Sequence, residues 1–329
     1  MSAPTNLAIS VVICAYATER WPDLVAAVES VHRQTVPPHE VIVVVDHNPD
    51  LLTRAHAHLA GVVVVENREE PGLSGSRNSG VAAAQGAIIA FLDDDAVATP
   101  AWLARLTAAY NTPHVIGVGG AIEPLWDTER PRWFPAEFNW VVGCTYLGMP
   151  TRATPVRNLI GCNMSFRREV FARVGGFRSG IGRIGARPVG CEETELCIRV
   201  HHAYPHSVLL YEPRAAVRHR VRRDRMHWRY FRQRCFSEGL SKAQVARAVG
   251  ANAALSNERR YTTRVLPRGV VHGVTHAVLG RDMWGGLGQV VSITVGLAVT
   301  TVGYLTGSLF VPSRTWRRPA RRACAGSWS

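Results

Sequence analysis

Short apolar runs alternate with helical patterns through the N-terminal third of the chain, and this alternation limits the possible folds more than any other feature. The runs occupy residues 9–14, 41–45, 62–65 and 87–92. Continuous runs of this length are typical of strands that are covered on both faces. The segments between them place apolar residues at helical spacing, and Pro37-Pro38 ends the first of these segments. The sequence therefore predicts an α/β fold with a mostly parallel, twisted sheet flanked by helices.

Acidic residues follow two of these predicted strands. Asp46 comes directly after residues 41–45, and Asp93-Asp94-Asp95 follows residues 87–92. Because ligands bind beyond the carboxyl ends of parallel strands, we expect these acids on one rim of the sheet. Packed carboxylates repel one another unless a cation shares them, and hard oxygen ligands select Mn²⁺ or Mg²⁺. The sequence therefore predicts a divalent-cation site, although an acidic turn or a helix cap would give the same local pattern.

A glycine-rich segment at residues 72–80 precedes the acidic run and contains Arg77 and Asn78. If this segment is a turn, its small residues would let the backbone approach a ligand. The planar guanidinium of Arg77 is suited to binding a phosphate. The segment has neither the ending of a P-loop nor the dinucleotide fingerprint. It predicts a phosphate-facing element only in combination with the other motifs.

Two further motifs have a structural and a chemical interpretation. Glu192 and Glu193 open a helical pattern, where acids complement the helix dipole. A carboxylate at this place could instead accept the proton of an acceptor hydroxyl. His219 ends a strand-like run, and it is either a structural histidine or a ligand of the same cation.

The formal charge of +13 favours polyanionic partners such as phosphorylated substrates or anionic lipid. Lys242 is the single lysine, so a coding bias towards arginine also contributes to the charge. Residues 218–234 are strongly basic with interleaved aromatic residues, which indicates phosphate contacts or a solvated helix. The seven cysteines form no CxxC pair, and we interpret them as reduced thiols in a cytoplasmic setting.

Residues 284–312 carry no charge and are long enough to cross a bilayer. Arginines on both sides leave the orientation open, and a spanning helix, an in-plane segment and a soluble core helix all remain possible. We expect a catalytic domain over residues 1–240, a helical linker over 241–283, this membrane-associated segment, and a basic tail over 313–329. Without an export signal, the catalytic domain is expected at the cytoplasmic face of the cell membrane.

Taken in chain order, these motifs resemble the family 2 glycosyltransferases, which are inverting enzymes with the GT-A fold. The resemblance runs from about Leu7 to about Gly239. It includes the strand and terminal acid of residues 43–50, Arg-Asn-Ser-Gly at 77–80, the Asp-x-Asp pattern at 93–95, the acceptor-side segment at 161–168 and the acidic pair at 192–193. Val45 and His47 depart from the usual Asp-Asp-Gly-Ser turn.

The resemblance assigns a role to each motif. It implies that the nucleotide sugar is bound by Ala15, Tyr16, Asp46, Arg77, Asn78, Asp93 and Asp94, with Asp46 at the uracil of a UDP-sugar. The metal, Mn²⁺ or Mg²⁺, would be held by Asp95 and His219. Glu193 would be the catalytic base, with Glu192 as the second choice. The acceptor side would include Asn163, Met164 and Arg222.

The resulting prediction is transfer of a sugar from a nucleotide diphosphate sugar to a hydroxyl of a glycan, a lipid-linked or a cell-envelope acceptor. A nucleotidyltransferase acting on sugar phosphates is one alternative, but residues 15–19 lack the basic glycine-rich loop that it would need. A basic nucleic-acid-binding protein is another alternative. It would not explain acids at several element ends, so no nucleic-acid partner is expected.

Overall fold

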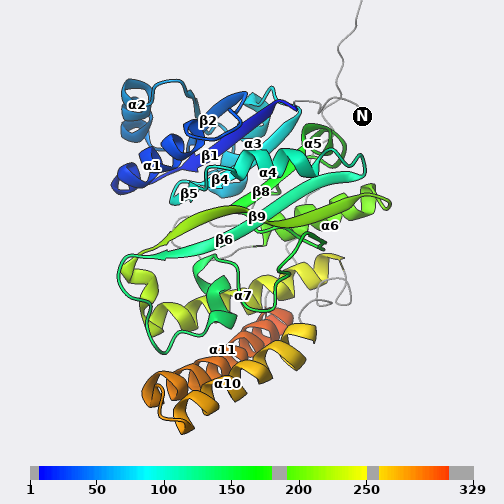
Figure 1. Ribbon diagram of the computed structural model, residues 1–329. Coiled ribbons are helices and arrows are strands. Elements are labelled where there is room, and N and C mark those ends of the chain that lie inside the picture. Colours follow the sequence, from blue (N-terminus) through cyan, green and yellow to red (C-terminus); the bar gives the residue numbers. More distant parts are fainter. Residues whose placement is uncertain (1–6, 180–190, 250–258, 311–329) are drawn as a thin grey trace, which may run out of the picture.

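The computed structural model describes residues 7–179, 191–249 and 259–310. Within these residues one sheet of nine strands forms the centre of the molecule, in the order β3-β2-β1-β4-β8-β6-β9-β5, with β7 beside β9. Figure 1 shows this sheet with helices on both sides. The strands are β1 (Ile9–Ala15), β2 (Glu40–Val45), β3 (Val63–Glu66), β4 (Ile88–Asp93), β5 (Ala96–Ala98), β6 (Val115–Trp126), β7 (Thr154–Pro155), β8 (Asn163–Arg167) and β9 (Val208–Val221).

The half of the sheet built by the N-terminal strands is parallel, as the sequence predicts. β1 pairs in parallel with both β2 and β4, and β2 pairs in parallel with β3. In this register Cys14 lies between Val44 and Asp93. The chain segments that follow β1, β2 and β4 therefore leave the sheet at one edge, and they bring Asp46 and the acidic run together.

The other half of the sheet is mixed, so the expectation of a mostly parallel sheet describes only the N-terminal half. β8 is antiparallel to both β4 and β6, whereas β6 and β9 are parallel to each other. No sequence pattern predicted β6, because its glycines and its half-exposed end interrupt the apolar run. β9 continues past the strand-like run that was expected to end at His219. Its second half alternates buried and exposed residues and carries the start of the basic segment.

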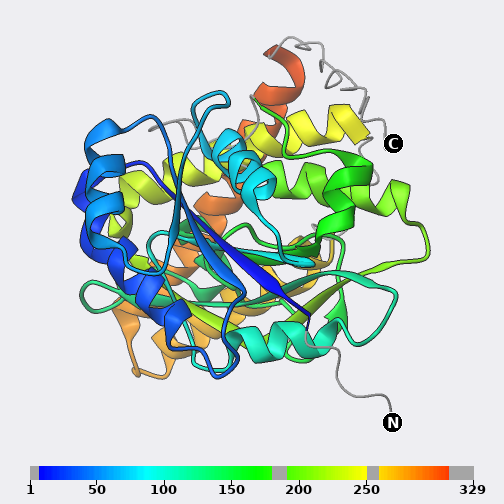
Figure 2. The same cartoon turned by 90° about the horizontal axis from the view of Figure 1, so that it is seen from above.

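Helices cover the two faces of the sheet and continue beyond it. The view from above shows α1 and α2 along one flank, with the strands running through the middle (Figure 2). The helices are α1 (Trp21–His32), α2 (Pro49–His58), α3 (Leu73–Ala83), α4 (Trp102–Ala109), α5 (Arg168–Val174), α6 (Glu192–Ala203), α7 (Trp228–Val249), α10 (Leu266–Val278) and α11 (Met283–Phe310), with short helical turns at η1 (Thr18–Arg20), η2 (Ala136–Val142), η3 (Arg223–Met226) and η4 (Tyr261–Val265).

The glycine-rich segment at residues 72–80 is the start of helix α3 rather than a turn, so the interpretation of an isolated turn is wrong. Gly72 has a φ of 122° and sets the chain direction before the helix begins. A Cβ at Gly80 would lie 2.4 Å from Val12 of β1, so only glycine lets α3 approach the sheet this closely. The small residues therefore serve helix–sheet packing and hold Arg77 at the edge where the strands end.

The C-terminal helices form a separate layer against the catalytic part. Figure 1 shows α11 and α10 below α7, at the end of the molecule away from α1 and α2. Helix α7 continues through residue 240, so the expected boundary there falls inside a helix. Residues 283–309 form one helix that is long and apolar enough to cross a membrane by length and composition. The basic tail at 313–329 lies outside the described residues.

Candidate active site

Two adjoining cavities open at the edge where β1, β2 and β4 end. The first has a volume of about 370 Å³ and is lined by Ala15, Tyr16, Asp46 and the acidic run at 93–95. The second has a volume of about 440 Å³ and lies towards α6, α7 and α11. Three residues line both cavities, namely Leu73, Asp93 and His219. Except for Asn78, the predicted nucleotide-binding and catalytic residues thus line these two adjoining cavities.

Asp46 is held rigidly by the turn that leads into α3. Its two carboxylate oxygens accept hydrogen bonds from the Gly72 amide (2.8 Å) and from Asn67 Nδ2 (2.6 Å). His47 follows in the left-handed region with a φ of 49°, where the family pattern has glycine. The carboxylate therefore lies at a fixed place in the first cavity.

Asp95 is buried at the centre of a cluster of cationic groups. Its Oδ1 lies 3.0 Å from His219 Nε2, and its Oδ2 lies 3.3 Å from the guanidinium groups of Arg20 and Arg225. Burial raises the pKa of Asp95, but His219, Arg225 and Arg20 outweigh it and hold the pKa well below its usual range. Burial lowers the pKa of His219, yet the charge and the hydrogen bond of Asp95 raise it to about 10.

Asp94 is the second buried acid of the run and has a different environment. Arg20 Nη1 donates to its Oδ1 at 2.7 Å. Its Oδ2 is buried and accepts no hydrogen bond from the described residues. Burial and the neighbouring Asp95 raise the pKa of Asp94 to about 7. Neither Arg20 nor Arg225 was predicted to contact the acids. Arg225 lies in the basic segment at residues 218–234, for which phosphate contacts or a solvated helix were expected, and only the fold brings the two arginines to the acids.

The residues present fit a divalent cation. Ligand atoms of Asp93, Cys162 and His219 lie within 4.8 Å of one another, and the Asp95 carboxylate contacts the same histidine. Carboxylate and imidazole donors are suited to Mn²⁺, and a thiolate would add a softer donor. The sequence predicted Asp95 and His219 but not Cys162, because a lone cysteine more than sixty residues after the acidic run gives no local signal. The two predicted ligands do lie side by side.

Both acids at the start of α6 line the second cavity, but Glu192 is paired with Arg77. Arg77 Nη1 lies 2.8 Å from Glu192 Oε1, and both side chains are buried. Burial lowers the pKa of Arg77, but the charges of Glu192 and Asp93 outweigh it and raise the pKa. Glu193 lines the second cavity, where Thr194 Oγ1 donates to it at 3.3 Å. Burial and the charge of Glu192 raise the pKa of Glu193 to about 8.

Four residues assigned by resemblance lie outside both cavities, so their predicted contacts with substrate have no support in the structure. Asn163 is fully buried and donates to the carbonyls of Ala121 and Ala215, because it begins strand β8 and points into the sheet packing. Met164 is equally buried in the core. The other two make fixed contacts elsewhere: Asn78 with the backbone of Phe177, and Arg222 with Asp23 at 2.6 Å.

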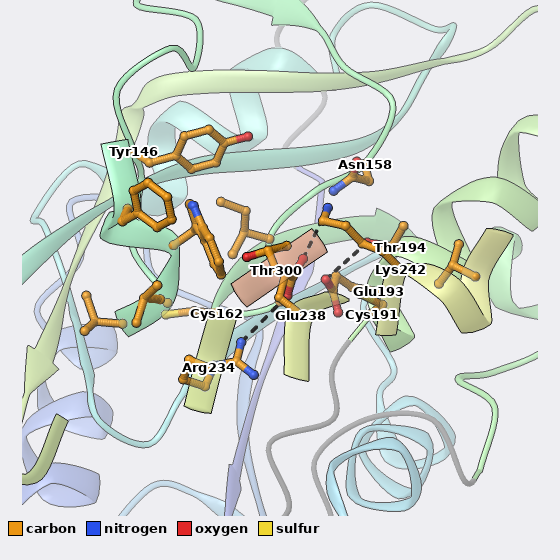
Figure 3. Close-up of a pocket in the computed structure, with 18 of the residues that line it drawn as sticks. Tyr146, Asn158, Cys162, Cys191, Glu193, Thr194, Arg234, Glu238, Lys242 and Thr300 are labelled. Carbon is orange, nitrogen blue, oxygen red and sulfur yellow. Dashed lines mark hydrogen bonds and ion pairs between the residues drawn. The ribbon is translucent and has the colours of Figure 1, made fainter. Parts of the chain in front are cut away.

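The second cavity has walls that the sequence did not predict. Figure 3 shows Glu193 and Glu238 in the same space, and Lys242 Nζ lies 3.3 Å from Glu238 Oε1. The aromatic and apolar part of the wall comes from η2, the loop after it, η4 and α11, with Phe138, Trp140, Tyr146, Tyr261, Leu297 and Tyr304. Helix α7 therefore contributes polar groups, and α11 contributes apolar contact, to the side that faces the predicted base.

Residues 10–175 match the family model described as Glycosyl transferase family 2. The glucosyl-dolichyl phosphate glucuronosyltransferase of Haloferax volcanii is 37% identical over 238 residues, which cover 71% of this chain and 76% of that protein. The succinoglycan biosynthesis protein ExoM of Rhizobium meliloti is 24% identical over 249 residues, 73% of this chain and 75% of that protein.

Two solved structures share the fold. A mannosyltransferase from Pyrobaculum calidifontis, in complex with GDP-Man and Mn²⁺, superposes with a TM-score of 0.58 at 17% identity and covers 92% of this chain and 89% of its own. GalNAc-T7 with UDP, GalNAc and Mn²⁺ superposes with a TM-score of 0.52 at 16% identity, covering 82% of this chain and 58% of its own.

The fold and the cavities define a glycosyltransferase with the GT-A fold. The chain belongs to glycosyltransferase family 2. The predicted family, fold and enzyme class are therefore confirmed. The comparisons support the glycosyltransferase and neither of the two alternatives, the nucleotidyltransferase and the nucleic-acid-binding protein.

Proposed function

We propose that this enzyme transfers a sugar from a nucleotide diphosphate sugar, with inversion, to a hydroxyl of a lipid-linked acceptor at a membrane. The observation that carries the proposal is the pair of cavities that share Asp93 and His219. One cavity presents acids and small residues at the strand ends, and the other presents Glu193. This arrangement supplies a donor site and an acceptor site on opposite sides of one reacting centre.

The first cavity is suited to the nucleotide diphosphate. Asp46 would accept hydrogen bonds from the base, Tyr16 offers an exposed ring, and Asp93 would face the ribose. Asp95 and His219 would hold Mn²⁺ or Mg²⁺, with Cys162 and Asp93 beside them. A cation bound there would neutralise the charge that develops on the departing diphosphate. The neighbouring structures with GDP-Man, UDP and Mn²⁺ support this choice of donor and metal.

The transfer needs one base and no covalent intermediate. The acceptor oxygen attacks the anomeric carbon from the side of the second cavity, and the bond from that carbon to the diphosphate oxygen breaks on the opposite side. The proton of the acceptor hydroxyl passes to the Glu193 carboxylate. Glu192 remains paired with Arg77 and keeps that guanidinium beside Asp93. The anomeric configuration therefore inverts.

The lipid-linked acceptor is supported by two observations. The relative from Haloferax volcanii is named for a glucosyl-dolichyl phosphate acceptor. The second cavity is bounded by helix α11, which is long and apolar enough to cross a membrane by length and composition. Both observations support a membrane location, and the six free thiols among the described cysteines support a catalytic part on the cytoplasmic face.

The donor is tested with the full chain and a panel of UDP- and GDP-sugars in the presence of Mn²⁺. Because a ligand that binds only the folded state raises its stability, we expect one UDP-sugar to raise the melting temperature most. The Asp46→Asn variant is expected to lose much of that shift in melting temperature. Its neutral amide has one hydrogen-bond acceptor fewer than the carboxylate for the proposed bonds from the base. A folded protein that no nucleotide sugar stabilises would contradict the proposed function.

The rate of transfer is expected to depend on pH through Glu193. Its pKa is raised to about 8, so the ionised form that accepts a proton becomes more abundant as pH rises through 8. We expect kcat/KM to increase with pH across this region and to level off above it. The measurement is a pH profile at saturating metal, with donor binding measured at each pH. A rate that falls over the same range would remove Glu193 as the base.

A further inference from the structure

The C-terminal helices α10 and α11 pack against the catalytic part along a stripe of small residues. A Cβ at Gly288 would lie 2.8 Å from Trp133, and one at Gly303 would lie 2.2 Å from the backbone of Phe236 on α7. Near the end of the helix, a Cβ at Gly307 would lie 2.8 Å from Ala243. Ser292 Oγ also donates to the carbonyl of Trp133 at 2.9 Å. Helix α11 is therefore in close contact with the protein over almost its whole length.

This packing is incompatible with a helix that crosses the bilayer away from the catalytic domain. Helix α11 has 28 residues and is ~42 Å long, which exceeds a hydrocarbon core of about 30 Å. Its neighbour α7, however, carries Glu238 and Lys242 in the cavity that α11 also lines, and Arg247 of α7 donates a hydrogen bond to the carbonyl of Ser308 on α11. If α11 crossed the bilayer, α7 would have to enter the hydrocarbon with it, and burying these charges there is costly. Helix α10 has 13 residues and is too short to span the bilayer.

The outer face of the same two helices is exposed and apolar. On α11 the exposed side chains recur at helical spacing from one end to the other, and Trp284 and Leu309 are 77% and 73% exposed. On α10 the exposed positions follow the same spacing, and Val278 is 79% exposed. The exposed residues of this stripe are Val271, Val274, Val278, Leu279, Met283, Trp284, Leu287, Val291, Val302, Leu305 and Leu309.

The charges around this apolar stripe are mostly positive. Arg264 and Arg268 are exposed at the start of the hairpin, and Arg281 is exposed at its turn beside the half-buried Asp282. Residues 313–329 add five arginines and no acid. An exposed apolar stripe with arginines at its borders and a tryptophan at a helix end matches the interface of an anionic bilayer.

We propose that the α10–α11 hairpin lies in the plane of the membrane and inserts its exposed stripe into one leaflet, so that the chain does not cross the bilayer. The glycine stripe faces the catalytic part and the apolar stripe faces the lipid. Both ends of α11 then remain on the side of the bilayer where the catalytic domain lies.

This arrangement deepens the proposed function, on which it rests for the nature of the acceptor. Leu297 and Thr301 are exposed on α11 and also line the second cavity. The cavity therefore opens beside the lipid-facing stripe. A sugar carried on a lipid phosphate could reach Glu193 while its hydrocarbon stays in the leaflet, and α11 forms the wall between the two.

The first experiment measures binding of the purified full chain to vesicles that contain anionic phospholipid. The double variant Val278→Asp with Trp284→Asp is expected to lose most of the binding, because two charges would enter the leaflet. The matched control is Val63→Asp, an exposed apolar residue on the edge strand β3, which should bind like the wild type. The proposal would be overturned if the double variant bound the vesicles as well as the wild type does. It would also be overturned if the wild type formed a dimer and did not bind the vesicles.

The second experiment decides between lying in the membrane and crossing it. A peptide tag follows Ser329, and the full chain is produced in bacterial membranes that are then prepared as inverted vesicles. We expect protease to remove the tag without detergent, because the tag and the catalytic domain share one side. A tag that is protected until detergent is added would show a crossing helix and overturn the proposal. Donor binding is measured on the same samples, so a failure of the proposed function is seen separately.

Discussion

Replacing Glu193 by glutamine is expected to lower kcat by roughly 10²–10⁴-fold, the range typical of a general base. The amide keeps the size of the side chain but cannot accept the proton of the acceptor hydroxyl. Binding of the nucleotide sugar should be unchanged, because Glu193 lines the second cavity and not the first. The measurement is turnover of the donor with the acceptor present, together with the donor dissociation constant from calorimetry.

Two neighbouring acids serve as controls for this variant. Glu238→Gln alters an acid of the same cavity that is paired with Lys242 at 3.3 Å, and it should have a much smaller effect on kcat. Glu192→Gln removes the partner of Arg77 and is expected to impair donor binding and stability together. Normal turnover in Glu193→Gln combined with a lost kcat in Glu192→Gln would transfer the role of base to Glu192.

Replacing Asp95 by asparagine is expected to lower the rate by about 10³-fold, since metal assistance to a leaving group contributes several kcal/mol. The loss should appear together with weaker binding of Mn²⁺, which is measured by calorimetry on the variant without donor. Asparagine is preferable to alanine here, because Asp95 is buried among His219, Arg20 and Arg225. Removing the whole side chain would leave buried cations without a partner and destabilise the fold.

The stability cost of Asp95→Asn needs a control away from the cavities. Asp23 is also buried and bridges Arg220 and Arg222, but it lines neither cavity. Asp23→Asn should lower the melting temperature and leave the turnover of the folded protein unchanged. If Asp95→Asn binds Mn²⁺ and turns over like the wild type, Asp95 is not a metal ligand, and Asp93, Cys162 and His219 become the alternative set.

Much of the site was predictable because its first half is built from local patterns. The apolar runs identify β1, β2 and β4, and the acids that follow them leave the sheet at the same edge by the geometry of parallel strands. Motif order added Glu193, which lines the second cavity, and His219, which lines both cavities. Motif order alone cannot tell which way a side chain points, and Asn163 of strand β8 points into the core and lies outside both cavities.

The sequence by itself determined the parallel half of the sheet, the acids at its edge and an apolar C-terminal segment, because each depends on residues close together in the chain. Only the tertiary structure decided which cations surround Asp95, that Cys162 lies beside His219, and that Glu192 is paired with Arg77 in the cavity that Glu193 also lines. The tertiary structure also decided that α11 packs against α7. These outcomes depend on contacts between residues far apart in the chain, and local spacing carries no information about such contacts.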